Sequence, residues 1–340
     1  MPASAAAGRL RSAPVDLDLV FLGTSASAPT ASRGASATLL RRGGDRILVD
    51  CGEGTQRQLL RSDAGLVDLE HVFLTHLHAD HVLGLPGMLK TFALRGREVP
   101  MTVYGPSGTA ALMRALGIVI GRLTYPFEVV ELRAGAVVER DDYRLETFAV
   151  AHGRSSVGYA LREDDRPGRF DVAAADALGV PDGPSRGALQ RGEVVSLDDG
   201  RVVRPEDVLG PPRRGRTIVL TGDTAPTPSV VEAARGADVL VHEATFLVDE
   251  RERARETDHS TTEDAAGVAR EAGVQLLALT HLSARYAGSE VAEEAARIFP
   301  STVVPRDFDL IDVPLPERGP PELVERGGRR ARRQDVGSET

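Results

Sequence analysis

Three histidines and one aspartate lie within residues 76–81, directly after the apolar residues 72–74. At the end of an extended strand, side chains two positions apart point the same way, so His76 and His78 can bind one ion together. Asp80 and His81 follow where the chain is expected to turn into a helix, and would face a second ion. A single histidine is more often structural, but here that interpretation must explain four donors at once. We therefore predict a metal site at the end of a strand.

Three further metal-ligand types end later apolar runs. His152 follows residues 148–151, Asp223 follows a run ending at residue 220, and His281 follows a run ending at residue 279. Taken alone, each is as compatible with a structural histidine or a turn-forming aspartate as with a metal ligand. Open α/β sheets, however, place functional groups just past the carboxyl ends of their strands. Together the seven side chains predict one binuclear metal site.

The donor types restrict the metal and the chemistry. With Cys51 as the only cysteine, a thiolate-rich site and an intramolecular disulfide are both excluded. Nitrogen and carboxylate ligands with open positions suit catalytic zinc, and Mn²⁺ is also compatible. A pair of such ions can activate water and neutralise both the attacking and the leaving oxygen of a displacement. Phosphodiester hydrolysis gains most from this arrangement.

Two more residues are candidates for proton transfer. His259 precedes Ser260 and Glu263, whose spacing is that of a capping box at a helix start. Glu243 ends another apolar run and is a candidate partner for His259. Such a carboxylate–imidazole pair can act as a general acid toward a leaving oxygen. The alternative is a capping residue beside a buried ion pair.

Bulk properties exclude some classes of protein. No apolar run approaches the ~20 residues that span a bilayer, and the N-terminus lacks the apolar core of a secretory signal. We therefore expect no membrane partner and, with a single cysteine, a cytoplasmic location. A net charge of −9 argues against indiscriminate nucleic-acid binding. It leaves open an RNA held by a local arginine cluster or by metal ions.

The chain predicts an α/β fold with an insertion. Apolar runs alternate with helical patterns over residues 15–160 and again over 217–313, which we interpret as two halves of one domain. Residues 161–216 are rich in Arg, Asp, Gly and Pro, and we predict an arm projecting from the core. Residues 314–340 form a Pro/Gly/Arg-rich tail that we expect to be disordered.

The histidine cluster at residues 76–81 resembles the signature of the metallo-β-lactamase superfamily. Longer strings resemble one branch, short-form ribonuclease Z, over roughly residues 17–313. These strings are residues 21–25 with 29–30, 50–56, 242–246, 259–261 and 280–286, and residues 183–192 of the arm. The resemblance implies a four-layer αββα metallo-β-lactamase-like sandwich with a protruding exosite arm.

The resemblance also implies an activity and roles for residues. The enzyme would be a zinc-dependent endoribonuclease that cleaves the 3′ trailer from precursor tRNA, leaving a 3′-hydroxyl on the tRNA and a 5′-phosphate on the trailer. It would hold two Zn²⁺ per subunit and form a homodimer in which one subunit's arm grips the tRNA processed by the other. Asp80 would accept a proton, and His259 with Glu243 would assist the leaving group. One zinc would be held by His76, His78 and His152, the other by Asp80, His81 and His281, with Asp223 bridging them.

Some features depart from the family pattern, and two other functions stay open. Gly34 follows Arg33 where the family commonly has asparagine, and the arm carries ten arginines but eleven carboxylates over residues 162–216. One alternative is a generic phosphodiesterase or hydrolase of the same superfamily acting on small molecules, which would have no use for the arm. The other is a catalytically silent metal-bound RNA-binding or sensor protein, which would normally show a broken ligand set.

Overall fold

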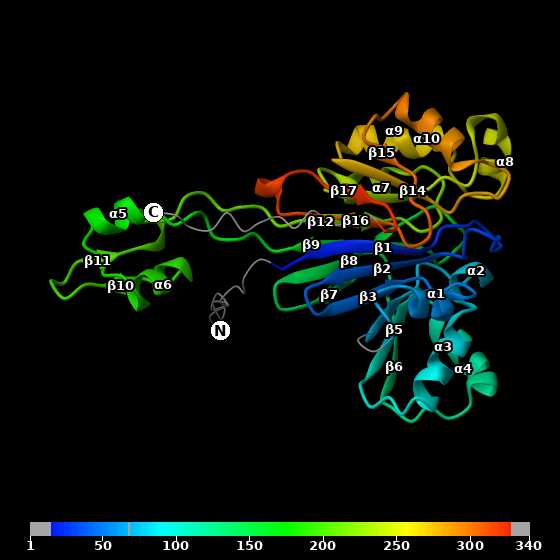
Figure 1. Ribbon diagram of the computed structural model, residues 1–340, viewed down its shortest axis with the longest axis horizontal. Coiled ribbons are helices and arrows are strands. Elements are labelled where there is room, and N and C mark those ends of the chain that lie inside the picture. The colour runs from blue at the N-terminus through cyan, green and yellow to red at the C-terminus, as the bar shows by residue number, and fades with distance from the viewer. Residues whose placement is uncertain (1–14, 67–68, 328–340) are drawn as a thin grey trace.

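Two large β-sheets face each other in the computed structural model, which describes residues 15–66 and 69–327 (Figure 1). The first sheet has eight strands, in the order β17 (Glu322–Val324), β16 (Leu310–Asp312), β1 (Leu17–Gly23), β2 (Ala37–Arg42), β3 (Asp45–Val49), β4 (His71–Phe73), β5 (Met101–Gly105) and β6 (Phe127–Glu131). The second has seven, in the order β15 (Thr302–Val303), β14 (Leu276–Thr280), β13 (Val239–Glu243), β12 (Thr217–Leu220), β9 (Val157–Glu163), β8 (Tyr143–Ala149) and β7 (Val137–Glu139).

Both faces of each sheet are buried. On β1, Leu17, Leu19 and Phe21 join the core between the sheets, whereas Val20 and Leu22 join a second core on the outer face. This separation follows from the two-residue alternation of side chains along a strand. A third core lies on the outer face of the second sheet. Strands buried on both sides read as near-continuous apolar runs, as they do in this sequence.

Helices cover the two outer faces. The first sheet is covered by α1 (Thr55–Arg61), α3 (Leu85–Leu94) and α4 (Thr109–Ile120). The second sheet is covered by α7 (Pro228–Ala234), α9 (Thr262–Ala272) and α10 (Gly288–Ala296), with η2 (Val248–Glu250) and α8 (Arg251–Glu256) at one end. The predicted four-layer αββα sandwich is confirmed.

Residues 164–216 leave the body between β9 and β12 and project well beyond it (Figure 1). This arm contains α5 (Val172–Ala177), α6 (Pro184–Gln190), β10 (Val195–Ser196), β11 (Val202–Val203) and η1 (Pro205–Asp207). It has a small core of its own, made by Ala175, Val180, Leu189, Val203 and Val208. The segment is therefore a folded unit despite its low apolar periodicity, because its helices and strands are too short to show a repeating apolar pattern.

The C-terminal region differs from the expectation of a disordered tail. Residues 316–318 form η3 (Pro316–Arg318), and β17 pairs antiparallel with β16 at the edge of the first sheet. Leu323 packs against the core between the sheets. The prediction is wrong for residues 314–327, because a three-residue strand gains its stability from a neighbour and not from its own sequence. The arginine-rich stretch 329–333 lies outside the described residues.

Two local details complete the fold. The helical segment that begins near Asp80 consists of α2 (Ala79–Val82) and α3, and a Cβ on Gly84 between them would lie 2.2 Å from the carbonyl oxygen of Gly52. Across the described ranges, the helices are all too short or too polar to cross a membrane.

Candidate metal centre and active site

All seven predicted ligands meet at one edge of the sandwich. His76 and His78 follow β4, and Asp80 and His81 lie in α2, so these four come from the first sheet. The other three come from loops of the second sheet. They are His152 after β8, Asp223 after β12 and His281 after β14.

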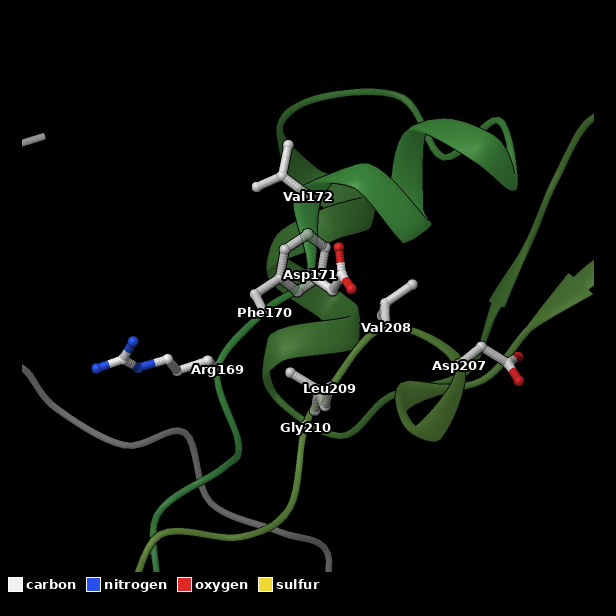
Figure 2. Close-up of a pocket in the computed structure, with 8 residues that line it drawn as sticks. All are labelled: Arg169, Phe170, Asp171, Val172, Asp207, Val208, Leu209 and Gly210. Atoms are coloured by element: carbon white, nitrogen blue, oxygen red, sulfur yellow. The ribbon is translucent and has the colours of Figure 1, made fainter. Parts of the chain in front are cut away.

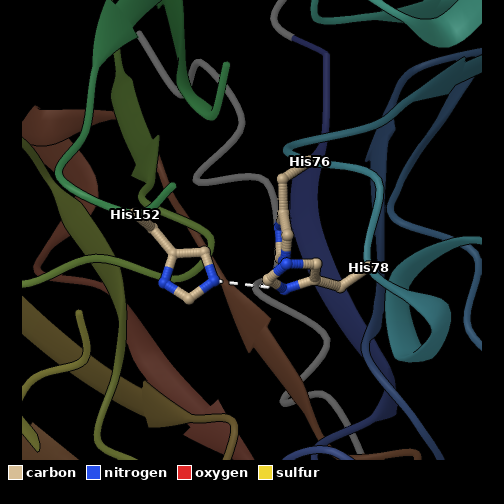
Figure 3. A group of neighbouring side chains, drawn as sticks. All are labelled: His76, His78 and His152. Carbon is tan, nitrogen blue, oxygen red and sulfur yellow. Dashed lines mark hydrogen bonds between the residues drawn. The ribbon is translucent and has the colours of Figure 1, made fainter. Parts of the chain in front are cut away.

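One histidine trio can share an ion. The ligand nitrogens of His76, His78 and His152 all lie within 4.8 Å of one another. His152 faces the other two across the gap between the sheets, with its Nε2 3.2 Å from Nδ1 of His78 (Figure 3). Burial lowers the pKa of His76 to about 2, so its imidazole is neutral, which is the form that binds a metal.

A second trio lies beside the first. Nε2 of His281 is 3.2 Å from Oδ2 of Asp80, and Nε2 of His81 is 3.6 Å from the same oxygen. The backbone N–H of Ser27 donates to that oxygen at 2.9 Å. Burial would raise the pKa of Asp80, but the hydrogen bond from His281 and the neighbouring histidines hold it well below its usual range. Asp80 is therefore ionised at neutral pH.

Asp223 lies between the two trios. Its Oδ2 is 3.4 Å from Nε2 of His81 and of His281, and 3.6 Å from Nε2 of His76. It is 4.0 Å from Nε2 of His152. One carboxylate oxygen is thus within reach of donors from both groups, which is the placement that a bridging ligand needs.

The donor set fits divalent cations. Nε2 of His76, Nε2 of His81 and Oδ1 of Asp223 are buried and have no hydrogen-bond partner within the part of the chain that the structure describes. Buried polar atoms without partners are rare in native proteins and call for an explanation such as an ion. The set contains only nitrogen and oxygen, in keeping with Zn²⁺ or Mn²⁺.

In most of these histidines, the ring nitrogen that faces away from the metal position is hydrogen-bonded to a neighbouring residue. Nδ1 of His81 donates to Oδ2 of Asp50 at 2.7 Å, and Nδ1 of His152 donates to the carbonyl oxygen of Asp258 at 2.9 Å. Nδ1 of His281 donates to the hydroxyl of Thr245 at 2.9 Å. Such bonds fix the tautomer and turn Nε2 toward the metal position.

Asp50 and Thr75 were not predicted as site residues. Oδ1 of Asp50 accepts from the backbone N–H of Thr75 at 2.8 Å, and the Thr75 hydroxyl lies 3.1 Å from Nδ1 of His76. Asp50 holds a left-handed backbone, with φ of 61°. The sequence signal for it was present, because Asp50 follows the apolar end of β3 just as the ligands follow their strands.

The two sheets also touch directly at the ligand loop. The hydroxyl of Tyr159, on β9, donates to the carbonyl oxygen of Leu74 at 2.7 Å. The backbone N–H of Val157 donates to the carbonyl oxygen of Thr75 at 2.9 Å. Thr75, the residue before the histidine cluster, is therefore bonded to the second sheet as well as to Asp50 of the first.

His259 and Glu243 form the predicted pair. Nδ1 of His259 is 2.7 Å from Oε1 of the buried Glu243. Burial would lower the pKa of His259, but the hydrogen bond to Glu243 and its charge outweigh that effect and raise the pKa to about 9. The imidazole also lies over that of His281, with ring centroids 5.5 Å apart. The pair is therefore adjacent to the ligand set.

The helix start beside His259 differs from the expectation. The N-cap of α9 is Thr261, whose hydroxyl accepts from the backbone N–H of Asp264, and Asp264 completes the capping box. The prediction of Ser260 with Glu263 is wrong by one position. The Ser260 hydroxyl donates instead to the carbonyl oxygen of Thr224 at 2.6 Å, beside the ligand Asp223.

Six of the eight histidines gather here, and two do not. His71, on β4, lies 3.1 Å from the guanidinium of Arg140 through its Nε2. His242, on β13, is fully buried and its Nδ1 donates to the carbonyl oxygen of Glu243 at 2.7 Å. Neither residue belongs to the clusters of candidate ligands.

Comparisons with known proteins give the family. Residues 32–166 match the model of the metallo-beta-lactamase superfamily. A ribonuclease Z of Gemmatimonas aurantiaca is 48% identical over 302 residues, covering 87% of this chain and 96% of that protein. A ribonuclease Z of Myxococcus xanthus is 52% identical over 271 residues, covering 79% and 88%.

A solved structure agrees with these relatives. The crystal structure of human tRNase Z, short form, is similar with a TM-score of 0.62 and 27% identity. The match covers 87% of this chain and 99% of the human one. The chain is thus a member of the ribonuclease Z family, within the metallo-β-lactamase superfamily.

Proposed function

We propose that the protein is a metal-dependent endoribonuclease that removes the 3′ trailer from precursor tRNA. The observation that carries this proposal is the meeting of seven metal-ligand side chains and a carboxylate–imidazole pair, in a chain whose ribonuclease Z relatives match it over most of its length. The products would be a tRNA with a 3′-hydroxyl and a trailer with a 5′-phosphate.

Each ion would have its own histidine-containing set. His76, His78 and His152 would hold one ion, Asp80, His81 and His281 would hold the other, and Asp223 would contact both. We assign two Zn²⁺ per subunit, with Mn²⁺ as the other cation that this donor set accepts. When bound there, such ions supply charge neutralisation at the phosphate and favour ionisation of water at neutral pH.

Asp80 is the proposed proton acceptor. Its carboxylate is ionised, it is only partly buried, and its position is fixed by the N–H of Ser27 and by His281. It can therefore take the proton of the water that attacks phosphorus while staying open to the substrate side.

His259 is the proposed proton donor. As the new phosphorus–oxygen bond forms, the bond from phosphorus to O3′ of the tRNA breaks, and O3′ needs a proton. A pKa raised to about 9 by Glu243 keeps His259 protonated at neutral pH and ready to supply it. Glu243 would act by orienting the ring and stabilising its positive charge.

The arm is the proposed grip on the tRNA body, outside the catalytic centre. Where the two connecting strands of the arm meet its folded end, a hollow of about 480 Å³ is lined by Arg169 and Phe170 and, across from them, by Val208 and Leu209 (Figure 2). Arginine contacts phosphates, and an aromatic ring can stack on a base. We also expect a homodimer, in which the arm of one subunit contacts the tRNA cleaved by the other.

Cleavage of a precursor tRNA carrying a 3′ trailer tests the activity. The cut should fall directly after the discriminator base, and should be lost on chelation and in Asp80→Ala. A cut elsewhere, or cleavage that survives both treatments, would overturn the proposal.

Removal of the arm separates this proposal from a small-molecule phosphodiesterase. Because Arg162 and Thr217 pair directly on adjacent antiparallel strands, a short turn can replace residues 165–215 and leave the bonded pair Glu163 and Arg216 in place. The shortened protein should lose cleavage of precursor tRNA and keep hydrolysis of a small aryl phosphodiester. Equal loss of both activities would contradict the role of the arm.

A further inference from the structure

The C-terminal segment contacts both strands of the arm's stalk, which we define as residues 164–170 and 209–216. Glu317, in η3, accepts from Nη1 and Nη2 of Arg166, each at 2.7 Å, and from Nη1 of Arg213 at 3.1 Å. Arg166 is on the outgoing strand of the stalk and Arg213 is on the returning strand. We call this cluster of three side chains the stalk clamp.

The bond between Glu317 and Arg166 has the geometry of a strong ion pair. Two parallel N–H···O bonds join the guanidinium to the carboxylate, an arrangement that fixes direction as well as distance. The side chains of Arg166 and Glu317 are 15% and 25% exposed. The hydrogen bond from Arg166 lowers the pKa of Glu317 to about 2, so the carboxylate remains charged across the physiological range.

Beyond its root, where Arg214 bonds Asp238 and Arg216 bonds Glu163, the stalk has little structure of its own to fix its direction. Its two strands pair only through isolated bridges, between Arg166 and Arg213 and between Phe170 and Leu209, within the residues that the structure describes. By contrast, η3 is followed by β17, which pairs with β16 in the first sheet. Glu317 therefore connects a weakly paired part of the stalk to a segment that is anchored in the first sheet.

We propose that Glu317 is a positioning residue that holds the arm at the angle at which it contacts precursor tRNA. The inference rests on the proposed function of the arm. It assigns a role in substrate binding to a segment that lies about a hundred residues after the arm in sequence and takes no part in the metal centre.

Kinetics on the full-length, metal-loaded protein test this role. Glu317→Ala and Arg166→Ala should each raise KM for precursor tRNA roughly five- to tenfold, because each removes the same partly exposed ion pair. The double variant should be no worse than either single one. The rate constant kcat and the hydrolysis of a small aryl phosphodiester should not change. Exchange of the two charges, Glu317→Arg with Arg166→Glu, should restore KM in part, because the guanidinium introduced at position 317 would face Arg213.

Glu325→Ala is the matched control, because it removes an exposed carboxylate from the same segment without touching the stalk. It should leave KM unchanged. An unchanged KM in Glu317→Ala, or a loss of small-substrate hydrolysis equal to the loss of tRNA cleavage, would overturn the proposal.

A distance measurement keeps the test independent of tRNA cleavage. The distance is measured between two spin labels, one on Asp198→Cys in the arm and one on Glu271→Cys on α9, both at exposed positions. The native Cys51 is buried and therefore protected from labelling. Glu317→Ala should broaden the distribution of distances between the labels, and the charge exchange should narrow it again. An unchanged distribution would refute the clamp. If the wild-type protein fails to cleave precursor tRNA, the proposed function fails while this measurement still decides the clamp.

Discussion

Replacement of Arg216 by methionine should destabilise the whole fold, although the residue is far from the metal centre. Its guanidinium is 2% exposed and bonds Glu163 twice, at 2.6 and 2.7 Å. It also donates to the carbonyl oxygens of Val313 at 2.9 Å and Val15 at 2.8 Å. One side chain therefore joins the end of β9 in the second sheet to the residues that flank β1 and β16 in the first sheet.

The magnitude follows from what the substitution leaves behind. Glu163 would keep Arg42, at 2.8 Å, and the backbone N–H of residue 216, at 3.1 Å, and the carbonyl oxygens of Val313 and Val15 would lose this side-chain donor. Removal of one partner of a buried ion pair costs ~3–5 kcal/mol, out of a total unfolding free energy of ~5–15 kcal/mol for a typical domain. Arg235→Met is the control, because Arg235 and its partner Glu232 are 61% and 73% exposed. An exposed pair of that kind contributes ~0–1 kcal/mol.

Urea unfolding of the metal-saturated variants measures the difference. Arg216→Met should lower the midpoint strongly at an unchanged slope, since the surface exposed on unfolding stays the same. The double change Arg216→Met with Glu163→Leu should recover part of the loss, because the buried carboxylate that lost its Arg216 partner is then absent. A loss in Arg216→Met no larger than in Arg235→Met would refute the reasoning.

Three other predictions concern the site. Gly52→Ala would place a Cβ 2.2 Å from the carbonyl oxygen of Asp80, so zinc affinity measured by calorimetry should fall, and an unchanged affinity would count against the described packing. Thr261→Ala should cost ~1 kcal/mol in urea unfolding through loss of the N-cap of α9; no loss would mean that Thr261 is not the cap. Glu243→Gln removes the charge that raises the pKa of His259. Because a general acid works only below its pKa, the alkaline fall in cleavage rate should then move to lower pH, and a pH–rate profile with the same alkaline limb would contradict the acid role.

The ligand positions could be predicted because they depend on strand direction alone. Asp223 and His281 follow parallel strands, whose carboxyl ends share one edge of a sheet. His152 follows β8, which is antiparallel to β9, and β9 is antiparallel to β12. Two reversals make β8 parallel to β12, so His152 reaches the same edge.

Other features depend on tertiary contacts that a sequence does not display. The Asp50 carboxylate reaches His81 only because the loop after β3 packs against α2. Gly52 lies in the same loop, and the backbone of Asp80 is so close to it that a side chain at position 52 would not fit. β17 is too short for an alternating pattern. The capping spacing before α9 occurs twice, and the local sequence does not decide between Ser260 and Thr261.

The bond from Tyr159 to Leu74 has a consequence for how this chain tolerates mutation. It fixes the separation of two sheets that each supply part of the ligand set. The free energy of metal binding is therefore coupled to the free energy of packing between the sheets. An ion that binds only the correctly spaced arrangement adds stability that grows with the logarithm of free metal concentration. A substitution that weakens the core between the sheets should therefore be silent in metal-replete cells and harmful when the metal is scarce. The supply of metal would thus determine how much sequence variation this core can carry.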